Sequence, residues 1–375
     1  MRRQMTLAAS AAILTLGAGQ AALAEARGYV VSNWAPAMNN PDESGCPDGK
    51  NWDISKMARA ALEAQGVPEA EIAKRITPEA LTQGAAGVIM GARGVKDGKP
   101  ASPYVYPLSV PDPKIKLDRS SEGFGFNLDG KVNTLDYTDP ATKETGVDNA
   151  AARVFGCFDR TRGTREAPSG NWSFRWSHYT EGNSWLVEVS NNSDRPLNFQ
   201  NDDNVTVNFY RGTQIPVMNS SGYQRNVSYT LDPDVKLKTF NSFKGKIKDG
   251  MFISDVMPQF KMIGSSRIQP VYDFKSVRMR MEFKPDGSIE GFVGGYLPIQ
   301  MIYFPFGDYA TGAEYYGMDV PGMYHALVQN ADSDIDIDKK TGKRTRISQT
   351  YQVLGVPAFI DRSLVAGAGQ KVAER

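Results

Sequence analysis

Apolar and polar side chains alternate along much of the second half of the chain. In the clearest case, residues 277–283, every second residue is apolar and the residues between are charged: Val277, Met279, Met281 and Phe283 against Arg278, Arg280 and Glu282. Pro285-Asp286-Gly287 then supplies a turn, and residues 289–293 return as a second apolar segment. A period of two on both sides of a turn is typical of a β-hairpin.

The same alternation predicts further strands and indicates how they pair. They lie at 185–189, 205–209, 332–338 and 343–353, the last two forming a hairpin with an acidic and a basic arm. One helix is predicted among them, at 321–329. Strands joined by short turns favour antiparallel pairing. We therefore predict a mainly β fold, with a jelly-roll-like antiparallel β-sandwich over residues 121–375.

The first part of the chain has helical patterns instead. Frequent Asn, Pro, Gly and Asp at 25–50 predict irregular coil. Three helices are predicted next, at 53–65 with Asp53 as cap, at 68–75, and from Thr77-Pro78 onward, followed by a Gly- and Pro-rich connection at 84–113. We expect residues 25–120 to form a helical and coil extension that packs on the main domain.

The N-terminus has the three parts of a secretory signal. Arg2 and Arg3 precede an apolar stretch at 5–19, and Ala22-Leu23-Ala24 supplies a small-x-small cleavage pattern. The apolar stretch is shorter than the about 20 residues that a membrane-spanning helix needs. We predict that residues 1–24 are a signal peptide, and that the mature chain is soluble, has no membrane span and resides in the periplasm or outside the cell.

Cys46 and Cys157 are the two cysteines of the chain. In an exported protein two cysteines most simply form a disulfide bond. Such a bond would hold the N-terminal region against the start of the β-rich region. Two free thiols, or a cysteine nucleophile, are the alternatives.

Three segments resemble a known family: Arg280 to Tyr296 (RMEFKPDGSIEGFVGGY), Pro321 to Ala331 (PGMYHALVQNA) and Val356 to Phe359 (VPAF). Gly146-Val147-Asp148-Asn149 and the pair Gly156-Cys157 fit the same pattern. On these residues the chain is similar to an uncharacterised family of exported bacterial proteins. No activity is known for that family, so the resemblance implies export and no site residues.

An aromatic segment is the first candidate for ligand binding. Trp172, Phe174 and Trp176 alternate with polar residues, and Arg175 and His178 lie within or beside the segment. If the segment is a strand, the three rings share one face. They would form either part of a sheet core or a platform on which sugar rings stack, with Arg175 or His178 at its rim.

Calcium is the cofactor that the sequence suggests. Asn127, Asp129 and Asn133 place side-chain oxygens at alternate positions around Gly130, a spacing that suits a hard cation. The aspartates of the 332–338 segment are spaced in the same way. Both segments depart from the EF-hand pattern. Asp129-Gly130 is also a standard hairpin turn, which is the alternative interpretation.

Several chemistries are excluded by residue counts. The two histidines, His178 and His325, cannot supply an HExxH or a three-histidine zinc site, and no GxSxG motif is present. The formal net charge of +1 argues against nucleic acid as a partner. We expect an exported non-enzymatic protein that binds a carbohydrate or an envelope protein. The alternatives are an extracytoplasmic hydrolase acting on a polysaccharide or ester, and a structural or assembly component of the envelope.

Overall fold

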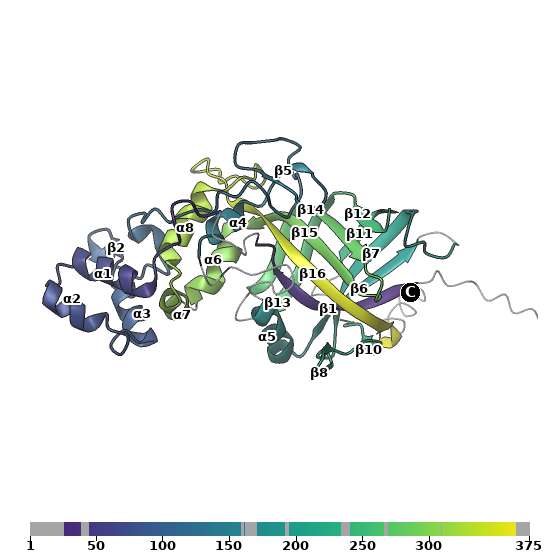
Figure 1. Cartoon of the computed structure of the whole chain (residues 1–375), viewed down its shortest axis with the longest axis horizontal. Coiled ribbons are helices and arrows are strands. Elements are labelled where there is room, and N and C mark those ends of the chain that lie inside the picture. Colours follow the sequence, from purple (N-terminus) through teal and green to yellow (C-terminus); the bar gives the residue numbers. More distant parts are fainter. Residues whose placement is uncertain are drawn as a thin grey trace, which may run out of the picture.

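The computed structural model describes residues 26–38, 45–158, 161, 171–191, 195–233, 241–265, 269–308 and 310–364; the predicted signal peptide at 1–24 lies outside them. The molecule is elongated (Figure 1). Its long strands gather at one end. A helical lobe of α1 (Ile54–Ala64), α2 (Glu69–Arg75) and α3 (Gln83–Gly91) forms the other end. Within the described residues, no helix is both long enough and apolar enough to cross a membrane.

The main sheet closes on itself. In the described part of the chain, eight antiparallel strands follow one another around a barrel: β1 (Arg27–Pro36), β6 (Ser184–Asn191), β7 (Asp202–Gly212), β11 (Asn241–Lys248), β12 (Met251–Ser254), β14 (Gln269–Phe283), β15 (Ile289–Pro298) and β16 (Arg346–Asp361). Pairing of β1 with β16 completes the circle. The mainly β, antiparallel prediction is confirmed. The two open sheets of a sandwich are replaced by one closed sheet.

Strand β1 makes this closure possible, and the prediction of coil at 25–50 is wrong for its residues. Gly28 lies opposite Ala358 of β16 on one side and opposite Glu188 of β6 on the other. A Cβ atom at Gly28 would lie 2.6 Å from the carbonyl oxygen of Ala358, so glycine is required at this close approach. The first described strand therefore joins two later parts of the chain.

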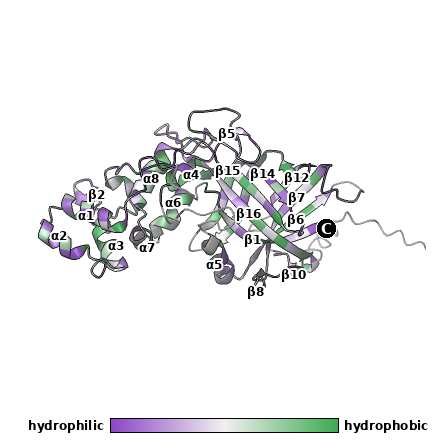
Figure 2. Ribbon diagram, in the orientation of Figure 1, coloured by the Kyte–Doolittle hydropathy of each residue, from purple (hydrophilic) through white to green (hydrophobic). Residues whose placement is uncertain are grey.

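The hairpin predicted from 277–293 is confirmed as β14 and β15, which pair with Met279 opposite Val293. The strands predicted at 185–189 and 205–209 are confirmed as parts of β6 and β7. Figure 2 shows the alternation of apolar and polar residues along the barrel strands. Two strands extend this sheet: β13 (Met257–Ser265) pairs with β14, and β10 (Val227–Thr230) runs parallel to β16.

The acidic arm of the predicted charged hairpin is not a strand. Asp336 has a φ of +58°, outside the β region, and the next strand begins only at Arg346. The expected charge pairing is nevertheless present, since Arg344 bonds to Asp334 and Arg346 to Asp336, each at 2.7 Å. The oppositely charged side chains therefore meet across a loop.

Aromatic rings fill the barrel. The Trp34 ring stacks between Phe260, at 5.8 Å between ring centroids, and Tyr351, at 5.0 Å. Its edge meets Trp185 at 5.1 Å. Large aromatic side chains bury extensive apolar area and gain further from edge-on and offset contacts. Tertiary packing of these rings therefore stabilises the closed sheet.

Four helices that follow the lobe in the sequence lie between it and the barrel: α4 (Ala150–Phe155), α6 (Ile299–Asp308), α7 (Ala310–Tyr315) and α8 (Val320–Gln329). Helix α8 confirms the predicted late helix, whereas α4, α6 and α7 were not predicted. The remaining short elements are β2 (Val95–Lys96), β3 (Lys99–Pro100), η1 (Pro107–Ser109), β4 (Tyr137–Thr138), β5 (Thr145–Val147), β8 (Met218–Asn219) and β9 (Gly222–Tyr223).

The lobe has its own apolar cluster, which includes Leu62, Ile72 and Met90. The predictions of helices at 53–65 and 68–75 are confirmed. The third helix begins at Gln83 instead of Thr77, because Thr77 caps a single turn and Thr82 accepts the capping hydrogen bond from Ala85.

The disulfide between Cys46 and Cys157 is confirmed, with a Cα–Cα distance of 5.8 Å. It joins the chain before α1 to the turn after α4. The Asn51 backbone N–H donates to the Cys157 carbonyl at 2.9 Å and reinforces the connection. A cross-link over 111 residues restricts the unfolded chain by about 4–5 kcal/mol in the loop-entropy account.

Candidate functional site

A cleft of about 830 Å³ lies between the segment 95–109 and helices α6 and α8. Tyrosines are its most frequent lining residues. The lining consists of Val95, Lys96, Asp97, Tyr104, Val105, Tyr106, Pro107, Leu108, Ser109, Gln300, Tyr303, Phe304, Gly307 and Tyr324. A concave surface of this size, with aromatic walls and a few polar groups, has the features of a ligand site.

One wall of the cleft is a hairpin with strict backbone requirements. Asp97 and Gly98 both have positive φ, +52° and +73°, as a tight two-residue turn between β2 and β3 needs. A Cβ atom at Gly94 would lie 2.1 Å from the carbonyl oxygen of Ala101, so glycine allows the arms to approach. The Ala101 N–H donates to the Gly94 carbonyl at 2.9 Å. The hairpin is therefore fixed by its own backbone.

The opposite wall comes from α6 and α8. The Tyr303 and Tyr324 rings meet edge to face at 4.9 Å, and the Gln300 side-chain amide donates to the Tyr324 hydroxyl at 3.0 Å. The Tyr303 hydroxyl donates to the Tyr104 carbonyl at 3.0 Å and ties the two walls together. Burial raises the pKa of Tyr104 and of Tyr303, and nearby Glu314 raises both further. Both phenols are therefore neutral; the Tyr303 hydroxyl is hydrogen-bonded, whereas the buried Tyr104 hydroxyl has no hydrogen-bond partner among the described residues.

A buried charged group holds the hairpin wall from behind. Arg93 bonds to Glu314 at 2.9 Å and to Asp319 at 3.3 Å. Glu314 is fully buried, and burial raises its pKa well above the usual range, against the opposing effect of Arg93. These residues join the end of α3 to α7 and α8. Neither Arg93 nor the two carboxylates line the cleft, so their role is to position the wall.

Exposed rings stand at the mouth of the cleft. Phe304 is 52% exposed and Tyr106 is 45% exposed, one on each wall. The Lys96 ammonium lies 4.0 Å from the centre of the Tyr106 ring, a cation–π contact that fixes the ring's orientation. Large apolar side chains grouped on a surface mark interaction sites, unlike single exposed ones. These rings are available to contact a ligand.

No protein-family model, no curated protein and no solved structure matches the chain. We therefore infer its function from the residues of the cleft themselves.

The predicted aromatic platform is a helix, so the strand prediction for 171–178 is wrong. Helix α5 (Asn171–Glu181) packs against β1 and β13, and the buried Phe174 meets Trp185 edge-on at 5.3 Å. His178 is buried beside it, and burial lowers the pKa of His178 to about 4 although the neighbouring Asn183 raises it. Phe174 and His178 thus face the protein interior.

The rest of this platform is only partly described. Arg175 is exposed and lies 5.8 Å from the Tyr223 ring, away from the cleft-lining residues. The side chains of Trp172 and Trp176 lie outside the described residues. Ligand binding by this segment stays a prediction.

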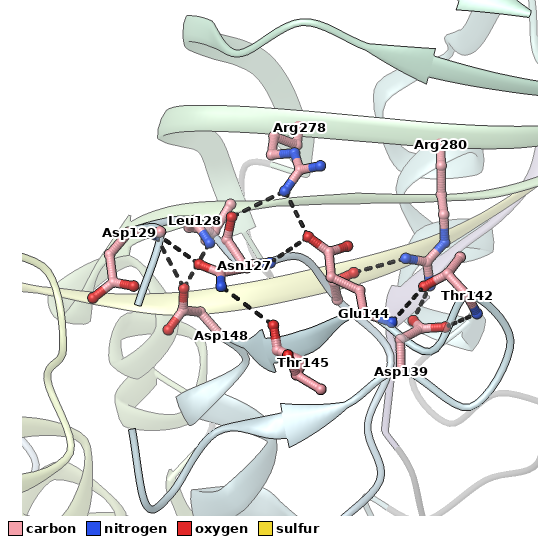
Figure 3. A network of polar contacts seen from close by, with 12 residues as sticks. Asn127, Leu128, Asp129, Asp139, Thr142, Glu144, Thr145, Asp148, Arg278 and Arg280 are labelled. Carbon is pink, nitrogen blue, oxygen red and sulfur yellow. Dashed lines mark hydrogen bonds and ion pairs between the residues drawn. The ribbon is translucent and has the colours of Figure 1, made fainter. Parts of the chain in front are cut away.

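Two of the three residues suggested for calcium, Asn127 and Asp129, lie in one turn (Figure 3). The Asn127 side-chain amide oxygen accepts from the Gly130 N–H at 2.7 Å, and the Asp129 carboxylate accepts from the Lys131 N–H at 2.8 Å. Asn133 lies beyond this turn and donates its backbone N–H to Asp136. The described residues contain no group of three or more His, Cys, Asp or Glu side chains that could hold a metal. Calcium binding stays a prediction.

The same region contains a buried carboxylate that was not singled out from the sequence. Asp148 accepts hydrogen bonds from the Leu128 N–H at 2.7 Å and the Asp129 N–H at 3.3 Å. The pKa of Asp148 is raised to about 7, chiefly by burial, although the hydrogen bond from Leu128 lowers it; the charge of nearby Asp332 contributes to the rise. Arg278 holds the loop from the other side, through the Asn127 carbonyl at 2.9 Å and Glu144 at 2.8 Å. The network thus anchors the loop on β14.

The cleft itself was missed because its residues are distant in sequence. Tyr104 and Tyr303 are about two hundred positions apart, and only the fold brings them together. One local signal was present: Pro103 to Pro107 reads Pro-Tyr-Val-Tyr-Pro, an aromatic cluster inside a Gly- and Pro-rich connection. Aromatic side chains in a segment without strand or helix periodicity are candidates for a binding surface.

Proposed function

We propose that this chain is an exported binding protein that holds a carbohydrate chain in the cleft between the β2–β3 hairpin and helices α6 and α8. The observation that carries the proposal is the exposure of Tyr106 and Phe304 on opposite walls of the cleft. A sugar ring has apolar C–H faces that pack on aromatic rings. Rings on two walls allow a saccharide to be held from both sides.

Polar groups beside these rings match the hydroxyl groups of a sugar. Gln300, Ser109 and Asp97 line the same cleft and can donate to or accept from hydroxyls. Lys96 and Asp97 have opposite charges, so the two charged residues of the lining cancel. The balance favours a neutral ligand with many hydroxyls.

Export is supported by the N-terminal pattern and by the disulfide. Residues 1–24 have the layout of a secretory signal. The Cys46–Cys157 bond suits an oxidising compartment such as the periplasm or the extracellular space. A carbohydrate ligand belongs to the same surroundings.

Binding is favoured over hydrolysis by the lining of the cleft. The usual glycosidase scheme uses two carboxylates about 5–10 Å apart. Among the described lining residues Asp97 is the single carboxylate, and the buried Glu314 is occupied by Arg93 behind the wall. The cleft thus offers surfaces for holding a saccharide and lacks the paired acids for cleaving one.

The proposal is tested by calorimetric titration with neutral oligosaccharides of glucose and of N-acetylglucosamine. We expect binding, and we expect Phe304→Ala and Tyr106→Ala each to weaken it about tenfold, or about 1.4 kcal/mol. Phe359→Ala is the matched control, because Phe359 is also exposed but lies on β16.

Two results would contradict the proposal. The first is an absence of binding by every neutral oligosaccharide in the panel. The second is a steady release of reducing ends from a bound oligosaccharide, which would make the chain a hydrolase.

A further inference from the structure

A second hollow, of about 650 Å³, lies where the residues before α1 meet the end of α7. It shares no lining residue with the tyrosine cleft. Four separate segments build it: Lys50, Asn51, Trp52, Asp53, Ile54 and Lys56; Lys116; Phe158; and Tyr315, Tyr316 and Gly317. Segments that are distant in the sequence therefore converge at this hollow.

Asn51 fixes the floor of this hollow. Its side-chain amide donates to the Lys116 carbonyl at 3.0 Å and to the Cys157 carbonyl at 3.3 Å, and it accepts from the Lys116 N–H at 2.7 Å. The Cys46–Cys157 disulfide links two of the same segments, the one before α1 and the one after α4. Lys116 is therefore held beside the 50–56 segment by paired backbone contacts, and the hollow is formed before any ligand arrives.

Positive charge predominates in the lining. The lining contains three lysines, Lys50, Lys56 and Lys116, and one carboxylate, Asp53. It therefore carries a net charge of +2 at neutral pH. A hydrogen bond from Ser55 lowers the pKa of Asp53, which is ionised and caps α1 by accepting from the Lys56 N–H. The positive end of the α1 dipole adds to the field.

Lys56 and Lys116 of this lining keep their charge available for a ligand. In the described part of the chain neither the Lys56 ammonium nor the Lys116 ammonium lies within 4 Å of a carboxylate. Other cations with little exposure, such as Arg93 and Arg346, are by contrast paired with carboxylates. An anionic group entering the hollow would therefore find cations that need no rearrangement.

Exposed aromatic rings accompany these lysines. Trp52 is 53% exposed, and Tyr315 and Tyr316 stand with their ring centres 5.5 Å apart at the end of α7. Gly317, with a φ of +79°, turns the chain directly after them and lies close to the Trp52 carbonyl. The hollow thus combines ring surfaces with positive charge, whereas the tyrosine cleft combines ring surfaces with balanced charge.

We propose that this hollow binds an acidic saccharide. A sugar ring stacks on Trp52 and the neighbouring tyrosines, and its carboxylate or sulfate group lies between Lys56 and Lys116. The shared chemistry is a sugar ring that bears a fixed anion, and the two sources, a uronic acid and a sulfate ester, are separated by experiment. The inference concerns a different site from the tyrosine cleft and holds whether or not that cleft binds a neutral saccharide.

The experiment titrates the mature full-length chain with hexagalacturonate, with its fully methyl-esterified form and with a sulfated maltohexaose. At about 50 mM NaCl we expect at least one of the two anionic saccharides to bind about tenfold more tightly than the methyl ester. Raising the salt to about 500 mM should weaken that binding about tenfold, because salt screens exposed charges. Whichever anionic saccharide binds identifies the source of the anion.

Variants locate the binding. We expect Lys56→Gln combined with Lys116→Gln, and separately Trp52→Ala, to weaken it about tenfold. Lys244→Gln combined with Lys248→Gln is the charge-matched control, because both lysines are exposed on β11 of the barrel. Phe304→Ala should leave acidic saccharide binding unchanged, since Phe304 lines the other cleft.

The proposal is overturned if neither anionic saccharide binds at the lower salt concentration. It is overturned equally if the sulfated saccharide does not bind and the methyl ester binds as tightly as hexagalacturonate. It is also overturned if the β11 control loses as much affinity as the Lys56 and Lys116 double variant. In that case the binding would reflect overall charge and not this hollow.

Discussion

The barrel and the helical end of this molecule use aromatic side chains in opposite ways. In the barrel, rings such as Trp34 and Trp185 are buried against one another inside a closed sheet. At the helical end, Trp52 and Tyr106 are exposed beside hollows. The first use stabilises a fold, because buried rings contribute through lost water contact and packing. The second use leaves rings free for a ligand.

The ion pairs at the two ends also have different roles. Barrel-side arginines such as Arg280, which bonds to Asp139, fasten loops onto the outside of the sheet. At the helical end one buried group, Arg93 with its two carboxylates, joins the lobe to α7 and α8. We infer that the two ends have different roles: the barrel supplies stability, and the helical end supplies the proposed binding surfaces.

The largest difference that we expect is between two tryptophans, one from each end of the molecule. Trp34→Ala removes a ring that is 1% exposed and packed between Phe260 and Tyr351, and should lower the free energy of unfolding by about 3–5 kcal/mol. Trp52→Ala removes an exposed ring and should cost less than about 0.5 kcal/mol. Denaturant unfolding followed by circular dichroism measures both. Equal losses would contradict the assignment of stability to the barrel.

Patterns in the sequence predicted the parts of the fold that depend on neighbours in the chain. The β14–β15 hairpin was predicted because Met279 and Met281 face the core while charged residues between them face outward. Helix α1 was predicted because Asp53 caps it and Leu62 lies on its apolar stripe. In both cases one face carries apolar residues and the other carries polar ones, so the period is visible in the sequence.

The same reasoning failed where the sequence shows no clear alternation, or shows one that does not match the element formed. Val30 and Val31 of β1 are both buried, one in an outer apolar cluster and one in the barrel, so no alternation remains to mark a strand. In α5 the buried residues Phe174 and His178 are four positions apart, a helical spacing hidden by the alternating aromatics. The β1–β16 closure and both hollows depend on contacts between distant residues, which no local pattern contains.

A second prediction concerns the connection between the two ends. Arg93→Met leaves the buried Glu314 and Asp319 without their cation, which should destabilise the helical end by about 3 kcal/mol. The barrel should keep its protection, because within the described residues the hydrogen bonds of Arg93 go to Met90, Glu314 and Asp319, and none of these lies in a barrel strand. Hydrogen exchange read by mass spectrometry should show faster exchange in α3 and α7 and unchanged exchange in β14 and β15.

The double variant Arg93→Met with Glu314→Gln is the control, since it removes one of the two unpaired acids and should recover part of the lost protection. Equal acceleration of exchange in the barrel would show that the two ends unfold as one unit.

A third prediction concerns the barrel side and depends on pH. Burial raises the pKa of Asp148 from 3.8 to about 7 in the folded chain. Between these values the folded state holds a proton that the unfolded state has lost, so this group's contribution to stability is full below about pH 4 and falls away as the pH rises to about 7. Asp148→Asn removes this loss, because an uncharged amide needs no proton there.

We therefore expect Asp148→Asn to be about 1–2 kcal/mol more stable than the parent chain at about pH 8, and about equally stable at about pH 4. Melting temperatures across this range measure the difference. Asp249→Asn, at an exposed turn between β11 and β12, is the control and should show no such trend. His178 gives the opposite slope, because its lowered pKa makes the fold lose stability as the pH falls from about 6.5 to about 4. Since His178 is present in both chains, its effect cancels in the comparison, and the remaining difference belongs to Asp148 together with the nearby acids whose charge it feels, such as Asp332.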